Sequence, residues 1–339
     1  MKKNSIWNAL ILLVGLGVCF LLIASHGPSE PAFEGKSLSF WLRQYGSTML
    51  ADSIPRREPN MAARNNQAVA AVRAIGTNAI PFLLRMLRAK DSAVCLQVLR
   101  LARTLHIKVP YRPAYERNRD GRDGFAILGD AARDAVPALA EIFEENISTP
   151  SQQATGTALW HLGASASAAR PTLLRSTTNS DSGVRLSALS ALDRQLDSSP
   201  ADVLPALLRA LNDPSYVVQS MAIKIIGGSG VQATGAVPTL ARLATNGDVR
   251  LRRSACGALG RISAVPEEAI PALVLGLEDP DAGVRKASAW SLGEFREQAK
   301  SAVPRLTALQ QDEDAGVRKA AGDALGKITA ALGPPASPR

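Results

Sequence analysis

The 339 residues of this chain include 46% hydrophobic and 20% charged side chains, a balance that allows a large buried core. Aromatic residues make up only 4%, whereas alanine and leucine are plentiful, which favours packed helices over a sandwich or barrel. The net charge of +9 suits nucleic acid, an anionic membrane surface or an acidic protein equally well. Cys19, Cys95 and Cys256 have no paired spacing and no CxxC motif, which argues against a disulfide framework and a zinc site.

The amino terminus combines positive charge with a long apolar run. Residues 1–5 contain Lys2 and Lys3, and the apolar run covers residues 6–24. At about 1.5 Å per residue the run spans roughly 28 Å, close to the hydrocarbon thickness of a bilayer. We predict an uncleaved transmembrane anchor, with a cleaved signal sequence or a lipoprotein signal ending at Cys19 as alternatives.

The charges around this run predict its orientation. Lys2 and Lys3 precede it, whereas Glu30 and Glu34 are the first charged residues to follow it. Because positive charge stays on the cytoplasmic side, we expect residues 1–5 to be cytoplasmic and the bulk of the chain to be exported. In a bacterium this location is the periplasmic side of the inner membrane.

The remaining chain divides by composition. We expect residues 25–61 to form a linker and a short capping helix, and residues 62–330 to form one regular array. Residues 107–123 interrupt the array with prolines, tyrosines and cations, and we expect an irregular insertion there. Residues 331–339 are rich in proline and glycine and are expected to be a disordered tail.

One pattern recurs at a fixed period across the array. Pro238, Pro271 and Pro304 follow one another at intervals of 33 residues, and so do glycines further along each copy, namely Gly227, Gly260, Gly293 and Gly326. A period of this length indicates stacked supersecondary units. We therefore predict an all-α fold, an α-solenoid of stacked helical hairpins.

Each repeat is expected to contain two helices. The proline suits the first turn of helix A, where its missing N–H has no partner to lose. The final glycine suits a left-handed cap at the end of helix B. Helix B is expected to start at an apolar residue soon after an aspartate or asparagine, namely at Val184, Val218, Leu251, Val284 and Val317.

The repeat carries Ala-Val-Pro-x-Leu, then Asp, then Val-Arg ending six residues beyond it. This pattern resembles the short HEAT-like repeat first associated with phycobilin lyases, and it covers residues 62–328. The order of apolar span, Gly-Lys-Ser-Leu-Ser-x-Trp-Leu, Ile-Pro-Phe-Leu-Leu and interrupted second repeat is similar to uncharacterised membrane-anchored HEAT-repeat proteins of environmental bacteria. The resemblance implies an α-solenoid without a known activity, and lyase activity does not follow from it.

Residues able to carry catalysis are scarce. His26, His106 and His161 are far apart in the sequence, and no phosphate-binding glycine loop is present, so we expect no catalytic residues, metal or cofactor. The recurring aspartates and arginines are expected to satisfy the turn between helices and to brace neighbouring repeats. These ladder residues are Asp213, Asp279, Arg285, Asp312 and Arg318.

The candidate binding surface comes from two positions of helix B. Counted from its first valine or leucine, the second and sixth positions carry several cations and tryptophans. Because helix B lines the concave side of HEAT arrays, these residues are expected to share one basic, aromatic trough, a composition typical of binding hot spots. The alternative is a solvated row of cations with tryptophans packed between repeats. The candidates are Trp160, Lys224, Arg253, Lys286, Trp290 and Lys319.

These observations favour a non-catalytic, membrane-tethered scaffold that recognises a protein or peptide, acidic partners included, on its concave face. The alternative is a nucleic-acid-binding protein similar to HEAT-like DNA glycosylases, which the basic charge would suit. An envelope enzyme is a third reading, although it would need an acid and base pair that the sequence does not show. An exported domain meets no chromosome, so its location separates the first two readings.

Overall fold

The computed structural model describes residues 30–51, 61–104, 106 and 111–332, which are mostly helical. The chain divides into two compact units, Met1–Ser165 and Ala166–Arg339. The predicted span, residues 6–24, lies outside the described residues. Within them, Ala62–Leu87 is long and apolar enough to cross a membrane by length and composition alone. The α-helix is interrupted there at Gly76, whose φ is +61°.

The first unit begins with a two-stranded hairpin in the stretch where the sequence predicted a linker. Glu34 and Gly35 at its turn have φ of +50° and +70°, and a type I′ turn requires positive φ at both positions. Trp41 donates its Nε1 hydrogen to the carbonyl of Phe33 and ties the hairpin to the next helix. The elements of this unit are β1 (Ala32–Phe33), β2 (Lys36–Ser37), α2 (Leu38–Ala51), α3 (Met61–Ile75), η1 (Gly76–Ala79), α4 (Ile80–Leu87), α5 (Ala93–Thr104), α6 (Ala114–Leu128), η2 (Gly129–Ala135), α7 (Val136–Glu144) and α8 (Thr149–Leu162).

The prediction of an irregular insertion over residues 107–123 is wrong from Ala114 onward, because Ala114 starts the regular helix α6. Helix α6 packs against α4 and α8 and so forms the second helix of the repeat that α4 begins. Asn118 donates Nδ2 hydrogen bonds to the carbonyls of Met86 and Leu87, both at 2.9 Å, and so satisfies the end of α4. Polar residues that the sequence assigned to an irregular insertion are therefore buried in a helix, and the extra helix is α5.

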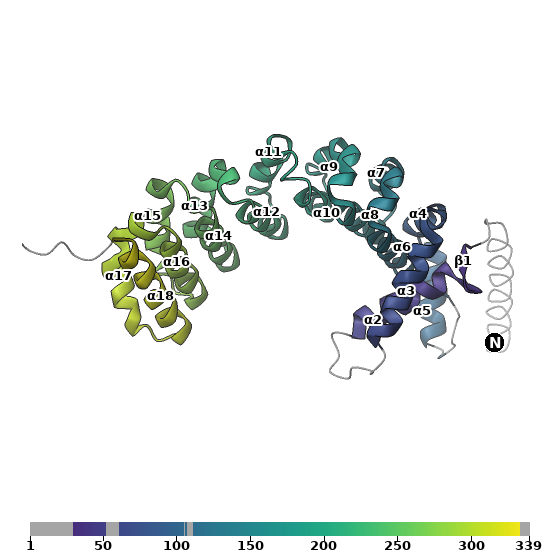
Figure 1. The fold of residues 1–339 in the computed structure, drawn as a ribbon, viewed down its shortest axis with the longest axis horizontal. Coiled ribbons are helices and arrows are strands. Elements are labelled where there is room, and N and C mark those ends of the chain that lie inside the picture. The colour runs from purple at the N-terminus through teal and green to yellow at the C-terminus, as the bar shows by residue number, and fades with distance from the viewer. Residues whose placement is uncertain (1–29, 52–60, 105, 107–110, 333–339) are drawn as a thin grey trace, which may run out of the picture. The chain divides into compact units, whose positions relative to one another are not determined.

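The second unit repeats one arrangement along the chain. Helices α12, α14, α16 and α18 pack one on the next as successive layers (Figure 1). Each is the helix B of its repeat, preceded by a shorter or more irregular helix A. The unit boundary falls within η3 (Gly163–Ala169). The elements that follow are α9 (Arg170–Ser176), α10 (Ser182–Asp193), α11 (Pro200–Ala210), α12 (Tyr216–Gly228), η4 (Gly230–Ala236), α13 (Val237–Asn246), α14 (Val249–Ile262), α15 (Pro266–Gly276), α16 (Ala282–Glu294), η5 (Arg296–Ala302), α17 (Val303–Ala308), η6 (Leu309–Gln311) and α18 (Ala315–Leu332).

Every helix B of the second unit starts two residues before the predicted position. The start of α16 shows the cause, because Asp281 accepts a hydrogen bond from Val284 N at 3.0 Å and acts as the N-cap. Helix A starts at the residue before its proline in most repeats, as predicted. Pro205 and Pro271 are exceptions, since they lie inside α11 and α15, which start at earlier prolines.

The prediction of left-handed caps at the repeating glycines is wrong, because Gly227, Gly260 and Gly293 have no positive φ and lie within helices. They are contact positions instead. A Cβ at Gly260 would lie 2.4 Å from Ser291 Oγ, and the neighbouring glycines meet the next helix B in the same way. Gly326 on α18 meets nothing within 4 Å among the described residues. Glycine therefore allows close approach between successive helices B.

The core of the second unit follows the predicted helix pattern. Ala222 and Ile225 of α12 are buried, as are the equivalent Ala255 and Ala258 of α14. Leu292 of α16 is fully buried. The apolar period of helix B therefore faces the interior, and its second and sixth positions lie off this stripe.

Candidate binding trough

Arginines and aspartates link successive repeats of the second unit in an ion-pair ladder. Arg285 donates from Nε and Nη2 to the two carboxylate oxygens of Asp312, at 2.8 and 2.9 Å. Its Nη1 donates to the carbonyls of Asp279 and Pro280 in its own repeat, both at 3.0 Å. One guanidinium therefore satisfies the turn of its own repeat and grips the carboxylate of the next.

The same geometry recurs earlier in the unit. Arg185 pairs with Asp213 at 2.7 Å from both nitrogens, and Arg252 pairs with Asp279 at 2.7 and 3.0 Å. The hydrogen bonds from Arg252 and Arg285 hold the pKa of Asp279 and Asp312 below the usual aspartate range. These carboxylates are bound structural groups.

The ladder residues predicted from the sequence all belong to this arrangement, but the carboxylate of each pair comes from the following repeat. Arg318 donates Nη1 to the carbonyls of Asp312 and Glu313, at 2.7 and 3.0 Å. No described carboxylate lies within ion-pair distance of Arg318. Arg185 and Arg252 were not predicted as ladder residues, although they occupy the same position of their repeats. The 33- or 34-residue period was the signal that could have found them.

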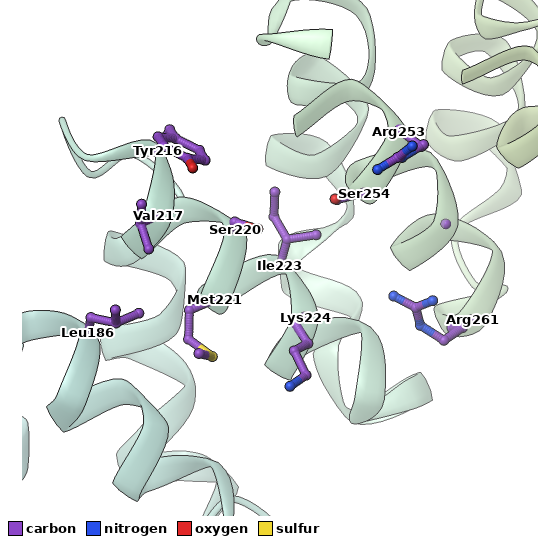
Figure 2. Close-up of a pocket in the computed structure, with 11 residues that line it drawn as sticks. Leu186, Tyr216, Val217, Ser220, Met221, Ile223, Lys224, Arg253, Ser254 and Arg261 are labelled. Carbon is purple, nitrogen blue, oxygen red and sulfur yellow. The ribbon is translucent and has the colours of Figure 1, made fainter. Parts of the chain in front are cut away.

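The exposed face of the helices B carries two hollows. The first, of about 540 Å³, lies between α12 and α14 and is reached by Leu186 of α10. Figure 2 shows the apolar side chains Leu186, Val217 and Met221 on one side, with the charged groups of Lys224 and Arg261 on the other. Its other lining residues are Tyr216, Ser220, Ile223, Arg253, Ser254 and Gly257.

The second hollow, of about 570 Å³, continues the same face from α14 across α16 to α18. Arg253 lines both hollows and joins them. Trp290 is 39% exposed, so its indole is available at the surface and is not packed away between repeats. We call the two hollows together the basic trough. The second hollow is lined by Arg253, Gly283, Lys286, Ala287, Trp290, Gly316, Lys319, Ala320 and Asp323.

The cations of the basic trough differ from those of the ladder. Within the described residues, none of them has a carboxylate within ion-pair distance. The trough has one carboxylate of its own among the lining residues, that of Asp323. A surface with several cations and one anion is electrostatically complementary to an acidic partner. The cations in question are Lys224, Arg253, Arg261, Lys286 and Lys319.

The structure brings together five of the six residues predicted for the trough, and both predicted helix positions line it. Trp160 is the exception, because it belongs to α8 of the first unit, is half-buried and packs edge-to-face on His161 at 4.9 Å. Sequence reasoning missed Tyr216, Val217, Met221 and Arg261. Tyr216 and Val217 were missed because helix B starts two residues before the predicted position.

The described residues offer little chemistry beyond binding. No group of three His, Cys, Asp or Glu side chains among them is placed to hold a metal ion. Burial raises the pKa of the Cys256 thiol to about 11, which keeps it protonated near neutral pH. Ser288 lies 3.3 Å from its sulfur, and a Cβ at the neighbouring Gly276 would meet both side chains. Cys256 is therefore a core residue where two repeats meet.

Comparison with known proteins places this fold in a family. The family model of HEAT repeats matches residues 204–281 and 270–338. The chain is similar in structure to the Escherichia coli protein YibA, with 12% identity and a TM-score of 0.53, covering 89% of this chain and 99% of that one. It is similar to Kap121p bound to Pho4p, with 12% identity and a TM-score of 0.53, covering 86% of this chain but only 34% of Kap121p. No curated protein sequence matches the chain significantly.

The stacked helical hairpins, the period and the family match agree. Residues 204–338 are HEAT repeats, and stacked helical hairpins of the same kind precede them in the chain.

Proposed function

We propose that the protein is a non-catalytic scaffold that binds an acidic protein segment in the basic trough. The observation that carries the proposal is the row of cations without carboxylate partners beside an exposed tryptophan. Tryptophan and arginine are enriched in the residues that dominate binding energy at interfaces. Kap121p, which shares the fold, was solved bound to Pho4p.

The mechanism is recognition without turnover. Each repeat is held to the next by close helix contacts and, at most steps, by an Arg–Asp pair. The trough is consequently formed before the partner arrives, and little conformational entropy is lost on binding. Long-range attraction between its cations and an acidic partner speeds encounter and weakens as salt is added.

The test compares two double variants of the full-length protein. Lys286→Ala with Lys319→Ala removes two trough cations, whereas Arg209→Ala with Lys300→Ala removes two exposed cations that do not line it. Affinity capture from envelope extracts should recover an acidic protein with the wild type and the control but much less with the trough variant. Its recovery should fall as salt rises.

Equal capture by the two variants would contradict the proposal, because the charge lost is the same in both. Capture that depends on nucleic acid, and disappears after nuclease treatment, would favour the nucleic-acid reading. Thermal unfolding checks both variants, since exposed side chains outside special interactions change stability by no more than about 0.5 kcal/mol.

We also propose that residues 6–24 anchor the scaffold to a membrane, with the trough on the exported side. Support comes from the sequence, where Lys2 and Lys3 precede an apolar run long enough to cross a bilayer. The full-length protein should then stay in membranes after a high-salt wash. A periplasm-dependent reporter fused after Arg339 should be active. Release as a shorter soluble form would favour cleavage and contradict the anchor.

A further inference from the structure

The second hollow contains a row of equivalent cations. Arg253, Lys286 and Lys319 follow one another at 33-residue intervals and occupy the same position of three successive helices B. The array therefore presents one cation per repeat along this row. Any partner that uses the whole row must repeat its negative charge at the spacing of the repeats.

Two side chains of this row, Arg253 and Lys286, lie along the trough and reach toward the next repeat, whereas Lys319 lies on the last helix of the array. A Cβ at Gly283 would lie 3.1 Å from Arg253 Cδ, and one at Gly316 would lie 3.4 Å from Lys286 Cδ. Each of these cations therefore rests over the first turn of the following helix B, where glycine leaves room for it. Equivalent contacts at successive steps keep the charged groups about one helix spacing apart, roughly 8–10 Å.

This spacing selects among partner conformations. A polyproline II segment has three residues per turn and a rise of about 3.1 Å per residue, so every third side chain falls on one face about 9 Å apart. A β-strand places residues three apart on opposite faces. An α-helix needs about seven residues to cover the same distance and has a diameter of about 10–12 Å.

The aromatic residues of the trough give a second, independent indication. Trp290 lines the second hollow and is 39% exposed, and Tyr216 lines the first hollow and is 44% exposed. Arg250 stacks on the Tyr216 ring with its guanidinium carbon 4.1 Å from the centroid, which holds that ring in place. Exposed aromatic rings in a groove are the usual docking sites for polyproline II segments.

We propose that the basic trough binds an extended polyproline II segment with a carboxylate at every third residue, one for each repeat. This inference rests on the proposed function and specifies the partner at the same site. The carboxylates pair with Arg253, Lys286 and Lys319, and the residues between them contact Trp290. The next part of the segment enters the first hollow, where Leu186, Val217 and Met221 provide an apolar wall beside Lys224.

The experiment measures binding of labelled peptides to the full-length protein by fluorescence anisotropy. The probe consists of repeated Pro-Pro-Glu triplets, and its control has the same residues with all glutamates gathered at one end. The repeated probe should bind about tenfold more tightly than the control, because only its carboxylates meet the three cations together. Lys286→Ala and Lys319→Ala should each weaken the repeated probe by about two- to fivefold.

A charge-reversal control distinguishes a variant that has lost the binding site from one that has simply misfolded. Lys286→Glu combined with Lys319→Glu should lose the Pro-Pro-Glu probe and gain a Pro-Pro-Lys probe of the same length. Recovery of binding with the opposite charge requires a folded trough. Loss of both probes, with unfolding at the wild-type temperature, would overturn the pairing.

The outcomes separate this inference from the proposed function. Equal binding of the repeated probe and its control, both weakened by the trough variants, would overturn the spacing and leave an acidic-partner trough. Tighter binding of a helical peptide with glutamate at every seventh residue would replace the extended segment by a helix. Both proposals would be overturned if the affinity for the probe were the same in every trough variant, or if single-stranded DNA displaced the probe.

Discussion

Helix α6 of the first unit and helix α16 of the second occupy the same place in their repeats but bury charge with opposite results. Arg285 of α16 grips both oxygens of Asp312, and the pKa of that carboxyl falls. Asp120 of α6 is fully buried, and burial raises its pKa although Arg112 opposes the shift. Arg112 Nη2 lies 2.7 Å from Asp120 Oδ2, but neither carboxylate oxygen accepts an aligned hydrogen bond.

The difference shows that proximity to an arginine does not by itself stabilise a buried carboxylate. In the ladder, two parallel hydrogen bonds from the guanidinium and one from the backbone replace the water that the carboxylate loses. In α6 the desolvation of Asp120 is not offset to the same degree. An Arg–Asp pair therefore favours the ionised carboxylate in the ladder, whereas in α6 burial outweighs the arginine and disfavours it.

The largest expected effect comes from removing the charge of a ladder carboxylate. Asp312→Asn leaves Arg285, whose side chain is only 10% exposed, without its bidentate partner. We expect a loss of about 3 kcal/mol in the free energy of unfolding, at the lower end for a buried pair because Arg285 keeps its carbonyl acceptors. Urea unfolding followed by circular dichroism measures it. An unchanged midpoint would show that the ladder contributes nothing and would break the comparison.

Packing can be separated from charge at the glycines of helix B. Gly260→Ala places a methyl group against Ser291 Oγ and its backbone, so we expect a loss of about 1–3 kcal/mol. Gly326→Ala is the matched control, since nothing described lies within 4 Å, and alanine should stabilise α18 by about 0.5–1 kcal/mol. Thermal unfolding of both variants should therefore move in opposite directions. Equal shifts would mean that the helices B do not meet at these glycines.

The same change made in α6 should have the opposite sign to that in the ladder. Asp120→Asn removes a buried charge that lacks aligned hydrogen bonds, and Arg112 retains Glu116 at 3.5 Å. We expect the free energy of unfolding to stay the same or rise by up to about 1 kcal/mol at neutral pH. Hydrogen exchange resolved by segment would locate the gain in α6. A loss as large as that of Asp312→Asn would equate the two regions.

The smallest expected signals are the pH dependences of these two variants. The Asp312 pKa is lowered on folding, so its stabilisation is present above the unfolded value of about 3.9 and disappears as pH falls through the folded value. The Asp120 pKa is raised, so its contribution is present at low pH and is lost as pH rises through the folded value. Between pH 3 and 7, the deficit of Asp312→Asn should grow with pH, and so should the advantage of Asp120→Asn. Parallel unfolding curves for wild type and variants would contradict both directions.

The architecture could be predicted from the sequence because, in a repeat, the same structural requirement is visible at several equivalent positions. The prolines and glycines predicted stacked hairpins, and the second and sixth positions of helix B predicted which side chains meet in the trough. The predicted role of the glycines was wrong, because a close contact between helices and a left-handed cap both favour glycine, and the sequence looks the same in either case. Only the neighbouring helix distinguishes them.

Helix α6 could not be predicted because its buried face carries polar residues where an apolar pattern would be expected. Asn118, Asp120 and Asp123 are buried, although such residues usually lie at the surface. Their burial depends on partners far along the chain, such as the carbonyl of Met86 that Asn118 reaches. Trp160 was assigned to the trough by analogy of position, and that analogy did not carry over to a helix of the other unit.

One step of the ladder carries no ion pair. At the arginine position α12 has Gln219, whose Nε2 donates to the carbonyl of Leu211 at 3.0 Å, and the aspartate position of the next repeat is Asn246. Because the stability of a solenoid is close to a sum over its neighbouring interfaces, the interface between α12 and α14 lacks the ion-pair contribution of those on either side and has the stacking of Arg250 on Tyr216 in its place. Under tension along the array, this joint is where we expect the stack to yield first. The first hollow lies across this interface, so we expect stretching of the array and widening of the binding surface to occur at the same place.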